Sequence, residues 1–297
     1  MTAPEKPVFR DVHYASDDGL TLHARDYDPE PTATAGRPAI VCLPGLTRNC
    51  RDFHPLAIAL SRQTVTPHRV VSIDYRGRGL SDWDRESQNY NLAVEAGDVV
   101  AACRHLGIDR AIFIGTSRGG LIVHLLAERA PEFLVAAILN DIGPELEPKG
   151  LMRIRDYLNT AEAPANWREA VIALKMRHLS EFPALSDDDW REMAEAIFRD
   201  VDGMLLPDFD PAIAAQLRNI DFARPLPDLW PQYARLAEIP LMLVKGENSD
   251  LISETTIRRM ETEHPGLSQI VAGGQGHAPL LHLEPILGAI RAFIATI

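Results

Sequence analysis

The sequence has little cysteine, fewer basic than acidic residues and no long apolar runs, and each shortage excludes a class of protein. Three scattered cysteines in 297 residues do not make a disulfide framework or a zinc site, so we expect reduced thiols, no metal and a cytoplasmic protein. Thirty Lys and Arg against 42 Asp and Glu give a net charge of −12, which disfavours nucleic acid and anionic membranes as partners. No apolar run is long enough to span a bilayer, and none follows Met1, so we expect neither an anchor nor a signal peptide.

The apolar pattern predicts an α/β core with a helical insertion. Hydrophobic residues make up 46% and charged residues 24% of the chain, which is typical of a globular protein. Short apolar strands alternate with amphipathic segments, as in a mostly parallel sheet covered by helices. The expected strands are 8–14, 20–25, 39–43, 70–74, 111–115, 134–140, 241–244 and 269–271. The expected core helices are 53–62, 92–106, one from 118, 255–263 and 279–293. From residue 143 to about 230 the alternation stops, and helical periodicity punctuated by prolines replaces it.

One motif lies where a predicted strand meets a predicted helix. Residues 112–120 read Ile-Phe-Ile-Gly-Thr-Ser-Arg-Gly-Gly, so an apolar strand runs through Gly-x-Ser-x-Gly directly into an apolar helix. A sharp turn of this kind raises the serine above the end of the sheet, and the small residues on either side relieve crowding. The backbone N–H groups at the start of the helix favour a negative charge that develops beside the serine. The motif therefore predicts Ser117 as a catalytic nucleophile.

A serine hydroxyl is a weak nucleophile at neutral pH and needs a neighbouring base. Of ten histidines, His277 lies in a glycine-rich loop, residues 273–279, between the last predicted strand and the last predicted helix. That loop follows the serine in the chain, which is the order expected for this motif. We therefore predict His277 as the base.

The base needs an acid to orient it, and three carboxylates are candidates. Asp250 lies just past the predicted strand 241–244 and is the preferred acid. Asp141 ends an earlier strand and is the alternative, although we prefer to interpret it as a helix or turn cap at the start of the insertion. Glu247 lies in the same loop as Asp250, closer to the strand.

Acyl transfer also needs two hydrogen-bond donors for the developing oxyanion. The backbone N–H of Arg118, directly after the serine, is one candidate. The second is the N–H of Leu46, in the loop Leu-Pro-Gly-Leu of residues 43–46 that follows a buried strand.

These motifs together resemble the α/β-hydrolase superfamily, in its branch with a helical cap, over nearly the whole chain. The matching landmarks, in order, are residues 43–46, 74–82, 115–119, 246–250 and 276–277. The resemblance implies a mostly parallel eight-stranded sheet flanked by helices, with residues 1–142 and 233–297 as the core and 143–232 as the cap. It also implies a triad of Ser117, Asp250 and His277 that acts without a cofactor. Two positions depart from the pattern, because many relatives have His where this chain has Pro44 and an apolar residue where it has Arg118.

Two arginines flank the expected oxyanion site. Arg48 and Arg118 are possible ligands of a substrate carboxylate. The competing interpretation, which we favour for both, is an ion pair with an acidic neighbour such as Asp74 or Asp82.

The sequence thus predicts a serine hydrolase of small-molecule carboxylic esters or lactones. A carbon–carbon bond hydrolase of a diketone-like ring-cleavage product uses the same triad and is the runner-up. A cofactor-free perhydrolase or haloperoxidase, and a receptor that keeps the scaffold without catalysis, are further alternatives. The oligomeric state is not predicted, because fold and motif leave it open.

Overall fold

A computed structural model of the chain describes residues 8–28, 34–63, 65–160, 163–218, 226 and 228–297. The expectation of no signal peptide concerns residues 1–7, which lie outside these ranges. Among the helices in these ranges, none combines the length and the apolar character needed to cross a bilayer.

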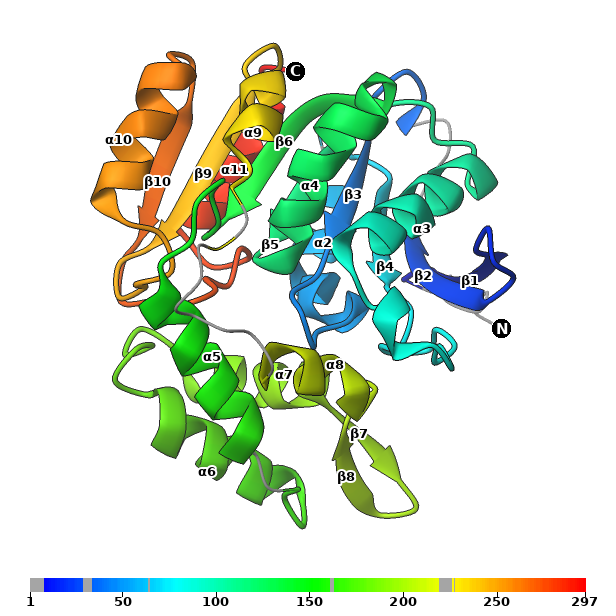
Figure 1. The fold of residues 1–297 in the computed structure, drawn as a ribbon, viewed down its shortest axis with the longest axis vertical. Helices are drawn as coiled ribbons and strands as arrows, with labels where there is room; N and C mark the ends of the chain where they lie inside the picture. The colour runs from blue at the N-terminus through cyan, green and yellow to red at the C-terminus, as the bar shows by residue number, and fades with distance from the viewer. Residues whose placement is uncertain (1–7, 29–33, 64, 161–162, 219–225, 227) are drawn as a thin grey trace, which may run out of the picture.

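An eight-stranded sheet forms the centre of the molecule (Figure 1), with the strand order β1-β2-β4-β3-β5-β6-β9-β10. The strands are β1 (Arg10–Ala15), β2 (Thr21–Tyr27), β3 (Ala39–Leu43), β4 (Val70–Asp74), β5 (Ala111–Thr116), β6 (Leu134–Asn140), β9 (Leu241–Gly246) and β10 (Ser268–Ala272). Strands β1 and β2 pair antiparallel, β2 is antiparallel to β4, and the other pairs are parallel. The predicted fold class, a mostly parallel eight-stranded sheet, is confirmed.

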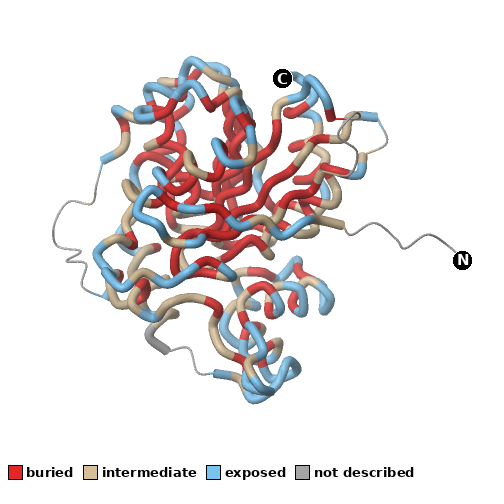
Figure 2. The backbone as a smooth tube through the Cα atoms, turned by 90° about the vertical axis from the view of Figure 1, so that its right-hand side faces the viewer, coloured by how far each residue is buried: buried red, intermediate tan, exposed pale blue. Residues whose placement is uncertain are grey.

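Helices cover both faces of the sheet. The core helices are α2 (His54–Ser61), α3 (Leu92–His105), α4 (Arg118–Arg129), α9 (Trp230–Leu236), α10 (Glu254–Glu263) and α11 (Ile286–Ile294). Helices α3, α4, α9 and α10 pack on one face, and α2 and α11 on the other. Along β5, Phe113 faces the first layer while Ile112 and Ile114 face the second, as the alternation of side chains in a strand requires. Buried residues accordingly concentrate in the sheet layer (Figure 2).

Between β6 and β9 the chain leaves the sheet and forms a separate group of elements on one side of it (Figure 1). These elements are α5 (Pro148–Thr160), α6 (Trp167–His178), α7 (Asp187–Ile197), β7 (Phe198–Val201), β8 (Met204–Pro207) and α8 (Pro211–Arg218). Among them, α6, α7, β7 and β8 share a small core around Leu174, Phe182 and Trp190. We call residues 143–229 the insertion.

Three details differ from the sequence-based expectations. The insertion is not wholly helical, because β7 and β8 form an antiparallel hairpin whose turn has Asp202 at φ 54° and Gly203 at φ 83°. An Asp-Gly pair favours such a turn and was the overlooked signal. Helix α11 begins at Ile286 rather than at residue 279. The predicted cap boundary at residue 232 falls inside α9. This helix packs on the core through Tyr233, whose ring centroid lies 6.0 Å from that of His124. The domain limits stay a prediction.

Polar contacts fix the insertion to the loop that follows β3. Asn49 Nδ2 donates to the carbonyl of Ala196 over 2.8 Å, and Arg51 Nη2 donates to the carbonyls of Ala196 and Phe198 over 3.1 and 3.2 Å. These carbonyls end α7, where a helix leaves acceptors without partners inside it. The same loop carries Leu46 and Arg48, so the insertion and the expected oxyanion loop are held together.

The tight contact between α4 and β3 can be tested by replacing a glycine of α4, with a glycine of α3 as the control. A Cβ on Gly119 would overlap the carbonyl of Leu43, whereas a Cβ on Gly97 in α3 meets nothing within 4 Å. We expect Gly119→Ala to lower the free energy of unfolding by about 1–3 kcal/mol or more through overpacking. Gly97→Ala should raise it by roughly 0.5–1 kcal/mol, because alanine favours a helix interior. Denaturant unfolding of both variants checks this, and equal effects would contradict the described packing.

Candidate active site

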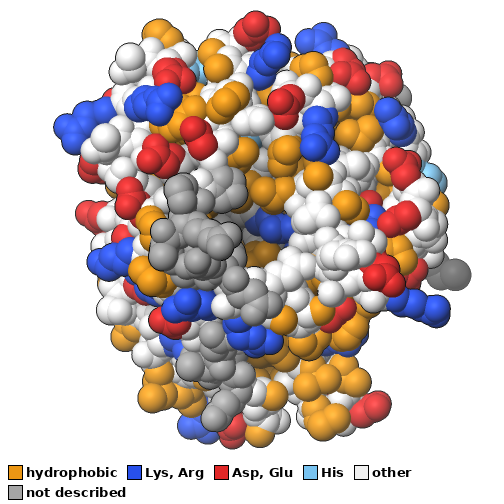
Figure 3. Space-filling view, viewed as in Figure 1, with side chains coloured by type: hydrophobic (Ala, Val, Ile, Leu, Met, Phe, Trp, Pro, Cys, Tyr) orange, Lys and Arg blue, Asp and Glu red, His pale blue; other side chains and the backbone are white. Residues whose placement is uncertain are grey.

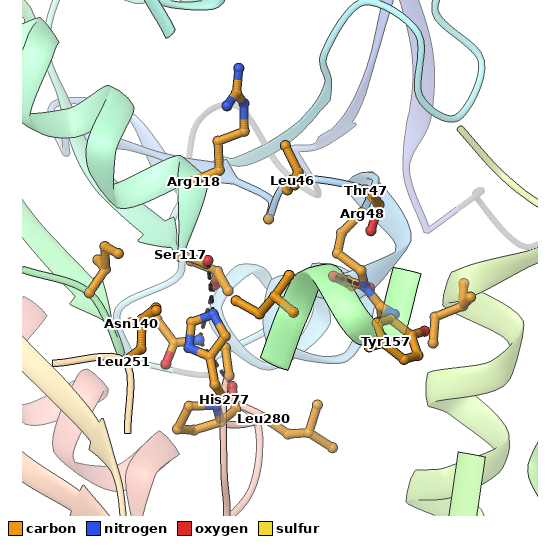
Figure 4. A pocket seen from close by; sticks show the side chains of 18 of the residues that line it. Leu46, Thr47, Arg48, Ser117, Arg118, Asn140, Tyr157, Leu251, His277 and Leu280 are labelled. Carbon is orange, nitrogen blue, oxygen red and sulfur yellow. Dashed lines mark hydrogen bonds and ion pairs between the residues drawn. The ribbon is translucent and has the colours of Figure 1, made fainter. Parts of the chain in front are cut away.

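Ser117 lies at the sharp turn between β5 and α4. Its backbone has φ 52° and ψ −114°, a left-handed conformation that non-glycine residues adopt only when the surroundings enforce it. Tight packing enforces it here, because a Cβ on Gly115 would lie 2.5 Å from the backbone nitrogen of Gly120. The turn presents the Ser117 side chain beyond the sheet, where its Oγ lies 2.8 Å from Nε2 of His277. The predicted pair is therefore brought together (Figure 4).

The other ring nitrogen of His277 meets a buried carboxylate. Its Nδ1 lies 2.7 Å from Oδ2 of Asp141, which directly follows β6 and is fully buried. The other carboxylate oxygen of Asp141 accepts the N–H of Gly246 over 2.9 Å and lies 3.7 Å from Nζ of Lys245. Burial raises the pKa of Asp141, but the hydrogen bond and charge of His277 and the charge of Lys245 outweigh it, so the pKa falls below its usual value. Asp141 is thus an ionised acceptor.

The structure corrects the choice of Asp250 as the partner of His277. The Asp250 carboxylate instead lies 2.5 Å from Nη2 of Arg153 and 3.7 Å from Nζ of Lys149, both on α5. Strand β9 continues to Gly246, two residues beyond its predicted end, and the loop after it carries Asp250 toward the insertion. The sequence places Asp141 directly after a strand, which made it a candidate. Only the strand order of the sheet shows that this strand, β6, lies beside β5, which ends at the turn with Ser117.

Glu247, the third candidate, supports the loop of His277 rather than its ring. Its Oε2 accepts the N–H of Gly274 over 2.6 Å. Asn140, which no motif singled out, donates through Nδ2 to the carbonyl of Pro279 over 3.0 Å. The histidine loop is therefore tied to β9 and to the end of β6.

Of the two amides expected to hold an oxyanion, one directly follows Ser117 and the other lies in a loop that comes close to Ser117. Arg118 is the first residue of α4, so its N–H has no acceptor within the helix. The loop with Leu46 follows β3 and comes close to Ser117. A Cβ placed on Gly45 would lie 3.9 Å from Cβ of Ser117. Arg78 Nε donates to the carbonyl of Leu46 over 2.9 Å, which anchors the peptide bond that follows the Leu46 Cα.

A buried ionic network connects the loop that carries Leu46 with the side chain of Arg118. Glu95, with no exposed surface, accepts from Arg78 Nη1 over 2.8 Å and from Arg118 Nε over 2.5 Å. Burial raises the pKa of Glu95, but the two guanidinium groups have the larger opposite effect, so the pKa falls below its usual value and the carboxylate stays charged. The expected ion pair of Arg118 thus exists, although its partner is Glu95 and not Asp74 or Asp82. Figure 4 shows the Arg118 side chain pointing away from Ser117 and His277.

A cavity of about 540 Å³ opens at Ser117 and His277, between the sheet and the insertion. Most of its lining is apolar and comes from both parts, including Leu46, Leu121, Ile142, Leu151, Ile154 and Phe182. Figure 3 shows a hollow between the two parts with hydrophobic and basic side chains in it. Such a cavity suits a small, mostly apolar ligand.

One group of side chains has the spacing of metal ligands. His23, Cys50 and Asp74 are buried, and their ligand atoms lie within 4.8 Å of one another. Asp74 already accepts from His23 Nδ1 over 2.7 Å and from the Cys50 N–H over 2.6 Å. These hydrogen bonds brace β2, β4 and the loop after β3.

Known proteins resemble this chain over most of its length. A family model described as alpha/beta hydrolase fold matches residues 38–282. A 3-hydroxybutyrate-oligomer hydrolase of Cupriavidus necator is 31% identical over 247 residues, which are 81% of this chain and 82% of the relative. A 2-(acetamidomethylene)succinate hydrolase of Mesorhizobium japonicum is 29% identical over 261 residues, 86% of this chain and 88% of the relative. The crystal structure of an alpha/beta hydrolase from Novosphingobium aromaticivorans matches with a TM-score of 0.89 and 35% identity, covering 98% of this chain and all of that one.

The contrast between Asp141 and Asp250 can be measured on Ser117 itself. A fluorophosphonate reacts with a serine that a histidine activates, and we expect the native chain to be labelled at Ser117. Asp141→Asn should slow labelling on the order of 10³–10⁴-fold, because the amide no longer holds the imidazole in the right tautomer. Asp250→Asn should change it by less than about threefold, since a partly exposed ion pair contributes little. The reverse ranking would contradict the geometry.

Proposed function

The chain belongs to the alpha/beta hydrolase fold family, and on that premise we propose that it is a serine hydrolase with Ser117 as nucleophile. In this proposal His277 is the general base, and Asp141 rather than Asp250 is the acid that orients it. The observation that carries it is one continuous line of hydrogen bonds, Ser117 Oγ to His277 Nε2 over 2.8 Å and His277 Nδ1 to Asp141 Oδ2 over 2.7 Å.

The first half of the reaction forms an acyl-enzyme. Because ionised Asp141 can only accept, the proton of neutral His277 lies on Nδ1 and its Nε2 is free to take the Ser117 proton. Ser117 Oγ then attacks the carbonyl carbon, and the oxyanion lies against the N–H groups of Leu46 and Arg118. His277 passes the proton to the leaving oxygen as the bond to it breaks.

The second half releases the acid. Water enters the place of the leaving alcohol, gives its proton to His277 Nε2 and attacks the acyl carbon. The tetrahedral intermediate uses the same two amides, and His277 returns the proton to Ser117 Oγ as the acyl bond breaks. Ser117, His277, Leu46 and Arg118, which take part in these steps, all line the cavity.

We propose a carboxylic ester or lactone as the substrate. An alkoxide is a better leaving group than an amine or a carbanion. Cleavage of an ester therefore needs less stabilisation of the leaving group than cleavage of an amide or a carbon–carbon bond. A relative named as a hydrolase of 3-hydroxybutyrate oligomers, which are joined by ester bonds, supports this choice. All three cysteines are free and buried, which agrees with the cytoplasmic location we propose.

We expect p-nitrophenyl acetate to acetylate the protein, with a burst of p-nitrophenol and a mass increase located at Ser117. Ser117→Ala should lower kcat by on the order of 10⁴-fold or more, because the covalent route is lost. Ser268→Ala, at an exposed position in β10, is the matched control and should retain native kinetics.

Two outcomes would redirect the assignment. Acetylation without further turnover would favour a receptor that retains the scaffold. Hydrolysis of diketones far ahead of esters and lactones in a substrate panel would favour the carbon–carbon bond hydrolase.

A further inference from the structure

The side chain of Arg48 begins beside the proposed nucleophile. A Cβ placed on Gly45 would lie 3.3 Å from Cγ of Arg48 and 3.9 Å from Cβ of Ser117. Two side chains that approach one point so closely are neighbours, and both line the cavity. Figure 4 shows the guanidinium of Arg48 directed toward Tyr157, across the cavity from His277, whereas that of Arg118 points away.

Only one edge of the Arg48 guanidinium is used. Its Nε and Nη2 donate to the two oxygens of Asp52 over 2.8 and 2.5 Å. No acceptor for Nη1 exists among the residues that the structure describes. Arginine has five N–H donors in a planar fork, so Nη1 and the second hydrogen of Nη2 remain available to a ligand. The neighbouring Arg51 differs, because it is engaged with Asp208 and with the end of α7.

The surroundings of this guanidinium disfavour a further positive charge, although Arg153 in the same cavity is itself paired with Asp250 and Glu181. His178 and Arg153, both from the insertion, line the same cavity. Burial, and after it the charges of Arg177, Arg48 and Arg153, lower the pKa of His178 to about 4. A charged His178 is thus disfavoured beside Arg48, even though two carboxylates, Asp52 and Glu181, line the same cavity. The remaining acids of the cavity, Asp189 and Glu192, lie beside His282 instead.

We propose that Arg48 binds a carboxylate of the substrate, so that the preferred substrate is an ester with a free carboxylate a few bonds from the scissile carbonyl. The carboxylate would accept from Nη1 and Nη2 while Asp52 holds the opposite edge and fixes the fork. This inference rests on the proposed serine-hydrolase function and adds the chemical class of its substrate.

The test compares each carboxylate-bearing ester with its primary amide, which has nearly the same shape and no charge. One series has the carboxylate on the acyl side, as mono-p-nitrophenyl esters of glutaric and adipic acid. The other has it on the alcohol side, as O-acetylated 3-hydroxypropanoate and 4-hydroxybutanoate, followed by acetate release. In at least one series we expect the native protein to prefer the carboxylate over the amide by about tenfold or more in kcat/KM.

Variants at Arg48 assign that preference. Arg48→Met should reduce the ratio to about one, and Arg48→Lys should retain part of it, because lysine keeps the charge without the fork. Arg62→Met is the matched control, since Arg62 is exposed at the end of α2 and outside the cavity, and it should retain the native ratio. The ratio compares two substrates on one protein, so it does not depend on the amount of folded protein.

Either of two results would overturn the inference: a native ratio of about one in both series, or a ratio that Arg48→Met leaves unchanged. Turnover of the amide-terminated esters without a preference refutes only the carboxylate site. Failure to hydrolyse any ester refutes the proposed function as well, so the two failures are distinguishable.

Discussion

The site depends on a charged carboxylate that is kept out of water. Asp141 has no exposed surface, and an isolated carboxylate there would take up a proton rather than remain ionised. The imidazole of His277, the amide of Gly246 and the ammonium group of Lys245 stabilise its charged form. Its charge in turn decides which nitrogen of His277 carries a proton, and hence whether Nε2 can take one from Ser117. The proposed chemistry therefore begins at the end of β6, although the serine and the histidine are on other elements.

The loop that carries the proposed oxyanion donor Leu46 depends on the same kind of buried charge. Glu95 connects Arg78, which holds the carbonyl of Leu46, with Arg118, which starts α4. One carboxylate thus links, through two arginine side chains, the two residues whose N–H groups we propose as oxyanion donors. The arginine after the serine, which departs from the family pattern, takes part in this network. Rigid donors of this kind stabilise a developing charge without reorganising.

Much of the fold could be predicted from local patterns. The strands 39–43, 70–74 and 134–140 have their predicted bounds, since short β-branched runs between turns leave little choice. The meeting of Ser117 and His277 was expected from the Gly-x-Ser-x-Gly turn and the glycine-rich loop. The β7–β8 hairpin was missed because a helical period was assumed across the whole insertion, although Asp202-Gly203 indicated a turn.

What could not be predicted depends on which segments become neighbours. Asp141 and Asp250 both follow strands, and the sequence does not reveal that Asp250 faces basic side chains of α5. An ion pair was favoured for both Arg48 and Arg118, and more strongly for Arg48, but the guanidinium of Arg48 lies in the cavity and that of Arg118 in the Glu95 network. Such differences arise from the packing of the insertion on the core, which local sequence does not encode.

A crystal structure of the protein with a phenylboronic acid would test the proposed site most directly, because a boronate bound to a serine has the tetrahedral shape of the intermediate. We predict a bond from boron to Ser117 Oγ, one boronate oxygen between the N–H groups of Leu46 and Arg118, and His277 still against Asp141. A boronate bound elsewhere, or an oxygen that neither amide contacts, would contradict this arrangement.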